Sequence, residues 1–281
     1  MRTFRGIGDP KLVSSVEVLA VLQLCAINEP LFPNLKSLNL WDIVGEFIPF
    51  IPLFLSPRTT SISITFTEHN PPKAVFVTSM VATFSTLCHN LQTIRLRPIP
   101  RDPIITAAVS EFLLNTNRDA LRQFHVDSPL TKEAREVIYR LPDLCGLWVV
   151  VEESTSLPTM VLPNLTEIGV EYHNNHDWLK GFRGAVFGRL NSVTFRPESE
   201  SAQIADFLEA FESAGPAIST SLSAFRYCAF HPWRPNYRSL LSFTQLRELE
   251  IYFSCDDGCS STIDDDIITD MARAMPRLEI L

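Results

Sequence analysis

Two imidazoles and a carboxylate lie close together in the segment His173-Asn174-Asn175-His176-Asp177, and this combination of side chains can bind a metal ion. The two histidines follow a His-x-x-His spacing on a polar stretch rather than on a helix, and no distant third ligand is indicated. We therefore interpret the segment as a polar loop. A metal-dependent enzyme with its centre here stays a remote alternative.

Two further segments carry residues that could bind a cation or form a redox pair. Cys255-Asp256-Asp257-Gly258-Cys259 can be read as a thiol pair or a weak metal site, but its Gly and Asp residues are typical of a loop. Asp264-Asp265-Asp266 could bind a hard cation, and it equally suits the positively polarised start of a helix. We expect neither segment to bind a metal, and we expect no cofactor.

Motifs of enzyme active sites are missing from the sequence. It contains no Gly-x-Ser-x-Gly, no P-loop, no Gly-x-Gly-x-x-Gly and no His-Glu-x-x-His. With 10 glycines in 281 residues, loops that cradle phosphate groups are not indicated. We therefore predict that the chain is not an enzyme and has no catalytic residues.

A short apolar pattern, Leu-x-x-Leu-x-Leu or a close variant, recurs along the whole chain at intervals of 21 to 32 residues. We call the first residue of each copy its leading residue. The leading residues are Leu35, Thr59, Leu91, Leu121, Leu144, Leu165, Leu190, Leu222, Leu246 and, in an incomplete tenth copy, Leu278. Repetition of this kind predicts a leucine-rich-repeat solenoid formed by residues 1–281 as a single domain, with about nine repeats and partial ones at the ends.

Each repeat is expected to contain a strand, a turn and a helix. Alternation of apolar and polar residues, as in Leu38-Asn39-Leu40, predicts the strands, and helical periodicity with start signals predicts the helices. The expected helices cover residues 13–26, 72–89, 103–116, 131–140, 177–187, 201–214 and 264–275. Because crossover connections between parallel strands are right-handed, the predicted fold is a right-handed α/β solenoid with a parallel sheet on its concave face and helices on its convex face.

Residues between the apolar positions of each strand are expected to face the concave surface. They include Asn39, Ser63, Thr65, Glu167, Thr194, Arg226, Cys228 and Glu250, together with the candidate partner-binding residues. We place the candidate partner-binding residues at Trp41, Arg95, Arg97, His125, Asp127, Trp148, Glu171, Arg196 and Tyr252. Trp, Tyr and Arg dominate the energetics of protein interfaces, and the arginines suit an acidic or phosphorylated partner. The alternative is that these side chains are solvated sheet residues and that Trp148 is tucked under a loop.

A turn of the type Phe32-Pro33-Asn34-Leu35 precedes many of the strands, and a second apolar, proline-containing segment runs from Phe47 to Pro57. Together with Leu162-Pro163-Asn164-Leu165 and the irregular repeat length, these segments resemble the leucine-rich-repeat region of fungal F-box proteins, especially those of mushroom-forming fungi. The resemblance covers nearly the whole chain. It implies the substrate-recognition repeats of a ubiquitin-ligase receptor, in which the F-box binds a Skp-type adaptor and cullin while the repeats hold the target protein.

The sequence departs from that family in two respects. An F-box is not identified in residues 1–281, since the first copy of the repeat already begins at Leu35, so an adaptor and a cullin are expected as partners only if an F-box lies upstream. The usual asparagine of the repeat turn is also missing, which predicts an irregular solenoid. A free-standing repeat scaffold or inhibitor, or a degenerate gene copy, stays open as an alternative.

The charge distribution bears on the class of partner, and the cysteine content bears on the location of the protein. Residues 1–140 carry 14 Lys and Arg against 12 Asp and Glu, whereas residues 141–281 carry 10 against 20. An acidic half argues against general nucleic-acid binding and allows a basic partner there, although acidic loops that merely keep the protein soluble explain it as well. The six cysteines match no disulfide or zinc pattern, and no membrane span is indicated. We expect a cytoplasmic or nuclear protein.

Overall fold

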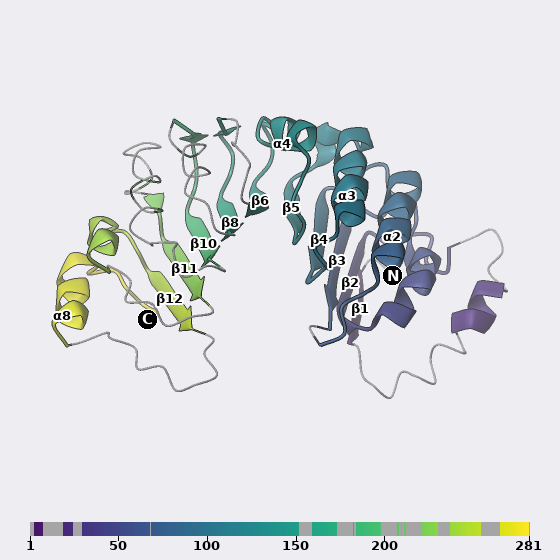
Figure 1. Ribbon diagram of the computed structural model, residues 1–281, viewed down its shortest axis with the longest axis horizontal. Coiled ribbons are helices and arrows are strands. Elements are labelled where there is room, and N and C mark those ends of the chain that lie inside the picture. The colour runs from purple at the N-terminus through teal and green to yellow at the C-terminus, as the bar shows by residue number, and fades with distance from the viewer. Residues whose placement is uncertain are drawn as a thin grey trace. The chain divides into compact units, whose positions relative to one another are not determined.

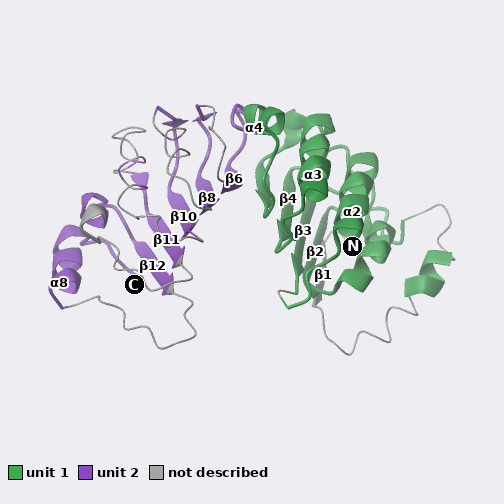
Figure 2. Cartoon of the chain, in the orientation of Figure 1, with its two compact units in different colours: residues 1–138 green, residues 139–281 purple. Residues whose placement is uncertain are grey.

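The computed structural model describes residues 3–7, 19–24, 30–67, 69–151, 159–172, 184–197, 221–229, 237–253 and 265–280, together with Phe182, Phe207, Glu209, Phe211 and Ile218. The chain divides into two compact units, residues 1–138 and residues 139–281 (Figure 2). Each unit is described by itself, and the single-domain organisation stays a prediction.

Unit 1 contains five described parallel strands that are adjacent in the order of the chain (Figure 1). They are β1 (Thr3–Ile7), β2 (Ser37–Ile43), β3 (Ser61–Phe66), β4 (Thr93–Arg97) and β5 (Gln123–Val126). Between the strands lie η2 (Gly45–Phe54), α2 (Ala74–Leu87), α3 (Pro103–Asn115) and η3 (Arg118–Ala120), and α4 (Lys132–Ile138) follows β5. This arrangement confirms the predicted α/β class with a parallel sheet.

The helix starts of unit 1 are set by local sequence. Asp102 accepts a hydrogen bond from the Ile104 amide at 2.8 Å and Pro103 occupies the first turn of α3, so that the fixed φ of proline and a capping carboxylate act together. Directly before α4, the Thr131 hydroxyl accepts a hydrogen bond from the Ala134 amide at 3.4 Å. The 3-10 helix η2 contains Pro49 and Pro52, which prevent a regular α-helix over this apolar segment.

Unit 2 also contains five described parallel strands in chain order, joined by different connections. The strands are β6 (Gly146–Val151), β8 (Glu167–Tyr172), β10 (Ser192–Pro197), β11 (Ala224–Ala229) and β12 (Glu248–Phe253). A second, two-stranded parallel sheet pairs β7 (Val161–Leu162) with β9 (Val186–Phe187). The remaining described elements are η5 (Tyr237–Ser242) and α8 (Asp265–Ala274).

The strand register follows the sequence repeat. In unit 1, Leu38, Ile62, Ile94 and Phe124 lie opposite one another on successive strands. In unit 2, the same position is occupied by Leu147, Ile168, Val193, Phe225 and Leu249. All of these side chains, and the leading residues from Leu35 to Leu246, are buried. Since complete burial of one large aliphatic side chain is worth about 1.5–3 kcal/mol, this repeated column of apolar residues accounts for a large share of the stability of each unit.

A hydrogen-bond motif repeats with the same register. The carbonyl that directly follows a leading residue accepts two backbone N–H groups from the next copy; for example, Lys36 O accepts from Thr60 at 2.9 Å and from Ser61 at 3.0 Å. The carbonyls that do this are those of Lys36, Thr60, Gln92, Cys145, Thr166, Asn191, Ser223 and Arg247. The last of them bonds Glu279 and Ile280, so the incomplete tenth copy continues the pattern.

The core of unit 2 is rich in stacked aromatic rings. Phe195 of β10 stacks on Phe207 with ring centroids 4.1 Å apart, and Phe211 lies 5.1 Å from Phe182. Phe207 and Phe211 are helical and fall within the helix predicted for residues 201–214. Phe207 packs on Phe195 of β10 and Phe225 of β11, whereas the buried helix faces of unit 1 are mainly aliphatic.

Three elements differ from the predictions. Strand β1 was not predicted: it pairs Phe4 with Leu38 and Gly6 with Leu40, in the register of a copy earlier than Leu35. The predicted helix 177–187 is wrong at its end, because Val186–Phe187 form β9. Strand β7 was also not predicted, since two residues are too few to show a periodicity. Of the helix predicted for residues 13–26, the described part, residues 19–24, is helical.

Candidate functional site

Strand alternation gives each unit one apolar face and one face of intervening residues, which we call the polar face. In unit 1 the polar face comprises Asn39 and Trp41 of β2, Ser63 and Thr65 of β3, Arg95 and Arg97 of β4, and His125 and Asp127 at β5. In unit 2 it comprises Trp148 and Val150 of β6, Gly169 and Glu171 of β8, Thr194 and Arg196 of β10, Arg226 and Cys228 of β11, and Glu248, Glu250 and Tyr252 of β12.

Trp41 and Tyr252 are the most exposed aromatic residues among the candidates. Their relative exposures are 55% and 63%, so each presents a large ring to solvent. Trp41 precedes Asp42, which has a left-handed backbone (φ 54°), and the register of β2 on β3 shifts between Leu40 and Ile43. The regular alternation of side chains along β2 is therefore interrupted directly after the exposed indole of Trp41.

Arg95 and Arg97 of unit 1 have different partners. Arg97 Nε lies 2.8 Å from Asp127 Oδ1, an ion pair at the end of β5. Arg95 donates from Nη2 to the neutral amide oxygen of Gln123 at 3.0 Å. The positive charge of Arg97 is therefore compensated by a neighbouring carboxylate, whereas that of Arg95 is bonded to a neutral group.

His125 lies beside these arginines and is 5% exposed. Burial first, and then the charges of Arg95 and Arg97, lower the pKa of His125 from 6.5 to about 3. The imidazole is therefore neutral at neutral pH, and its Nε2 is buried with no hydrogen-bond partner among the described residues.

In unit 2, Trp148 lies flat against the neighbouring strand at Gly169. A Cβ built on Gly169 would lie 1.9 Å from Trp148 Cε3, so only glycine leaves room for the indole there. Trp148 is 7% exposed as a result of this and its other contacts. Glycine at this position of β8 thus determines where the tryptophan packs.

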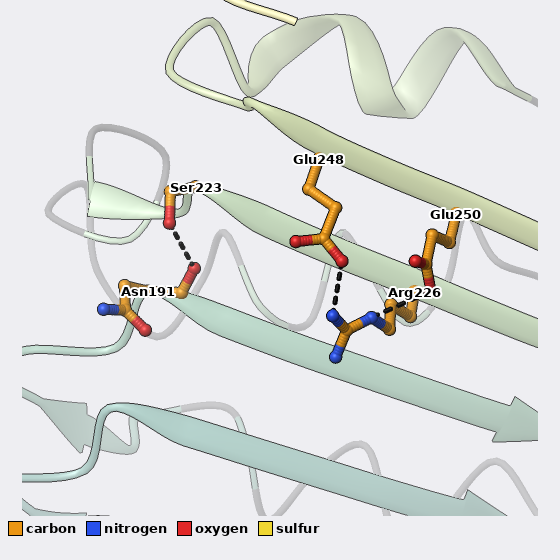
Figure 3. A network of polar contacts seen from close by, with 5 residues as sticks. All are labelled: Asn191, Ser223, Arg226, Glu248 and Glu250. Atoms are coloured by element: carbon orange, nitrogen blue, oxygen red, sulfur yellow. Dashed lines mark hydrogen bonds and ion pairs between the residues drawn. The ribbon is translucent and has the colours of Figure 1, made fainter. Parts of the chain in front are cut away.

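Ion pairs continue across the polar face of unit 2. Arg196 Nη1 lies 3.9 Å from Glu171 Oε2, and Arg226 of β11 lies between Glu248 and Glu250 of β12 (Figure 3). Arg226 Nη2 contacts Glu248 Oε1, and its Nε lies 2.9 Å from Glu250 Oε2. Hydrogen bonds and charges from both glutamates raise the pKa of Arg226 against the opposing effect of burial.

The structure places the predicted partner-binding residues in two groups. Trp41, Arg95, Arg97, Arg196 and Tyr252 reach solvent fully or partly, whereas His125, Asp127, Trp148 and Glu171 are buried. These four side chains belong to the polar face but are buried within it, so they do not present an open surface to a partner in this conformation. Arg226 was placed on this face but not among the candidates, although Glu248-x-Glu250 on the next strand was the signal for it. Whether any of these residues contacts a partner stays a prediction.

Most residues of the motifs with possible metal chemistry lie outside the part of the chain that the structure describes. His173–Asp177 and Cys255–Cys259 lie outside the described residues, as does Asp264. Asp265 and Asp266 occupy the first turn of α8, as predicted for a helix start. No group of three or more potential metal ligands occurs in the described part of the chain. Within the same residues, no helix is long and apolar enough to cross a membrane.

No protein-family model matches the chain, and no curated protein matches it.

Proposed function

We propose that this chain is a leucine-rich-repeat solenoid that binds a protein partner through its polar faces. The observation that carries this proposal is the carbonyl directly after a leading residue, which at eight of the copies accepts two N–H groups from the next copy. Repeats that bond and pack only onto their sequence neighbours are typical of solenoid proteins, which use the exposed face of their strands for binding. The concave position of the sheet belongs to this proposal.

The residues on the polar faces support protein binding over other roles. Trp41 and Tyr252 offer large exposed rings, and Arg95, Arg97 and Arg196 are half-buried on the polar faces of their own units. Aromatic residues and arginine are the types that contribute most to protein interfaces. In contrast, the exposed apolar residues of α2 and α3, Val75 and Ile104, have smaller, aliphatic side chains.

For the specific role, we propose the substrate-recognition repeats of an F-box-type ubiquitin-ligase receptor, on the basis of the Phe32-Pro33-Asn34-Leu35 and Phe47–Pro57 segments. In that role the repeats perform no chemistry: they hold a target protein while partner subunits transfer ubiquitin. A Skp-type adaptor and cullin join only if an F-box precedes the repeats. A cytoplasmic or nuclear location follows from the same proposal.

Affinity enrichment from cells tests partner binding on each unit. Trp41→Ser and Tyr252→Ser are compared with Val75→Ser and Ile104→Ser, which remove exposed apolar side chains from helices. A partner that binds the polar face is lost, or at least tenfold depleted, with one of the first two variants and retained with both controls. Equal retention in all four variants contradicts the proposal.

The ligase role is tested separately by mapping the 5′ end of the transcript. An upstream in-frame F-box supports this role, and an in-frame stop directly before Met1 contradicts it.

A further inference from the structure

One register row of unit 1 contains an unusual number of unpaired polar atoms. Asn39, Ser63, Arg95 and His125 lie side by side on β2, β3, β4 and β5. Asn39 Oδ1, Arg95 Nε and His125 Nε2 are buried without a hydrogen-bond partner among the described residues. Folded proteins rarely leave such atoms unpaired, since each one lowers stability, and three in a single row indicate a surface completed by a ligand.

The charges around this row determine which ligand fits. The contacts of Arg95 in the described structure are to neutral groups: it donates to Gln123, and its register neighbour His125 is a neutral imidazole. Arg97 is already paired with Asp127. On β4 and β5 the face therefore carries one excess positive charge, at Arg95.

A single uncompensated guanidinium favours a carboxylate over a phosphate monoester. The planar donors of arginine match the two oxygens of a carboxylate, and one positive charge balances one negative charge. A phosphate dianion would bring a second negative charge close to Asp127. Four strands spaced about 4.8 Å apart make the row about 14 Å long, which an extended segment of four or five residues can span.

We propose that this row binds an acidic, extended segment of a protein partner, with an Asp or Glu carboxylate on Arg95 and His125 and an N–H donor of the segment on Asn39. The partly exposed end of Arg95 meets the carboxylate first; in this proposal the neutral imidazole of His125 carries its proton on Nε2, and a shift of the end of Arg95 lets that N–H donate to the carboxylate. This inference rests on the proposed function in that the ligand belongs to a protein that binds the polar face.

Selection of peptides from a random library displayed on phage, against the purified full chain, tests the proposal. We expect enriched peptides to share one Asp or Glu, and replacement of that residue by Asn or Gln to weaken binding about tenfold or more. Arg95→Gln should weaken binding of the parent peptide by the same factor. Replacing the acidic residue of the peptide should then no longer change its affinity for this variant. Arg118→Gln, which removes an exposed charge from η3, is the matched control and should leave binding unchanged.

The role of His125 has its own variants. His125→Phe removes the donor and should weaken the acidic peptide, whereas His125→Gln keeps an amide donor and should restore part of the affinity. Far-UV circular dichroism checks that each variant is folded. If both variants bind like the unchanged chain, His125 does not contact the carboxylate and the proposed site is wrong.

The outcomes separate this inference from the proposed function. Peptides that bind but share no acidic residue, or that ignore Arg95→Gln, overturn the carboxylate site and leave protein binding intact. A peptide with phosphoserine in place of the acidic residue that binds more than tenfold tighter overturns the choice of carboxylate. If no peptide is enriched, titration of the chain with acetate decides: a shift of the His125 imidazole NMR signal that Arg95→Gln abolishes supports the site, and its absence refutes it.

Discussion

The burial of His125 links the polar face to the stability of unit 1. Above about pH 6.5 the imidazole is neutral in both the folded and the unfolded chain. Below that pH the unfolded chain takes up a proton, whereas the folded chain does not until the pH approaches about 3, so the free energy of unfolding falls as the pH falls through this window. Burial and then the charges of Arg95 and Arg97 are what keep the pKa of the folded-state imidazole low.

We therefore predict that unit 1 loses about 2 kcal/mol of stability between about pH 7.5 and pH 5 through this residue, an order-of-magnitude value from a pKa of about 3. His125→Gln should lack this part of the pH dependence, since glutamine does not titrate. Urea unfolding at several pH values, compared between the two proteins, measures the difference. Parallel curves of stability against pH would show that His125 is protonated equally in both states.

Residue identities alone could not give the exposure of the polar-face side chains. Alternation correctly assigns His125, Trp148 and Glu171 to the face opposite the core, because the side-chain period of a strand is two. It carries no information on how far a side chain lies over its neighbours. The burial of Trp148 depends on Gly169 one strand away, a contact that requires the register to be known first.

At the scale of elements, the strands that repeat the full pattern could be predicted and the others could not. The leading residues predict the register of β2 to β5 in unit 1 and of β6, β8, β10, β11 and β12 in unit 2, because burial of one apolar column leaves one alignment. Strand β1 could not be predicted from the pattern because Gly6 occupies a position that is apolar in the other copies. Val186–Phe187 continue a helical periodicity in the sequence, but β7 pairs with them, and this tertiary pairing overrides the local signal.

Thr59 shows how a polar leading residue joins two copies. Its side chain is fully buried, yet Oγ1 accepts from the Ser56 amide at 3.1 Å and donates to the Leu35 carbonyl at 3.2 Å. The hydroxyl thus connects the leading residue of one copy to that of the preceding copy. An apolar side chain at this position would match the other copies but would lose both bonds.

Thr59→Val is accordingly expected to destabilise unit 1 by about 1–3 kcal/mol, although it brings the position closer to the apolar pattern. The matched control is Thr60→Val, because the Thr60 hydroxyl donates to Lys36 O at 3.3 Å in an exposed position, where water replaces the bond. Its expected effect is within about 0.5 kcal/mol. Urea unfolding followed by circular dichroism compares the two. If Thr59→Val is as stable as the unchanged chain, apolar filling outweighs the two hydrogen bonds.

At the scale of the whole molecule, the feature common to both units is the strand with its preceding turn. The amide of the leading residue donates to the carbonyl three residues earlier in Phe32–Leu35, Leu141–Leu144, Leu162–Leu165 and Met275–Leu278. The returning segments differ: unit 1 uses α2 and α3, whereas unit 2 uses the short strands β7 and β9 between its first three strands. Repeat length can vary from 21 to 32 residues because only the strand and turn are held to one geometry.

This organisation predicts that the two compact units respond separately to a local defect. Phe84 of α2 and Phe225 of β11 are both fully buried, and replacement of either by leucine should cost about 1–2 kcal/mol. Hydrogen exchange followed by mass spectrometry should show faster exchange within residues 30–138 for Phe84→Leu and within residues 184–280 for Phe225→Leu, because in a repeat array stability is a sum of local terms. Each variant serves as the control for the other. If both variants accelerate exchange across the entire chain to the same degree, the two units unfold as one, and the chain behaves as a single cooperative domain.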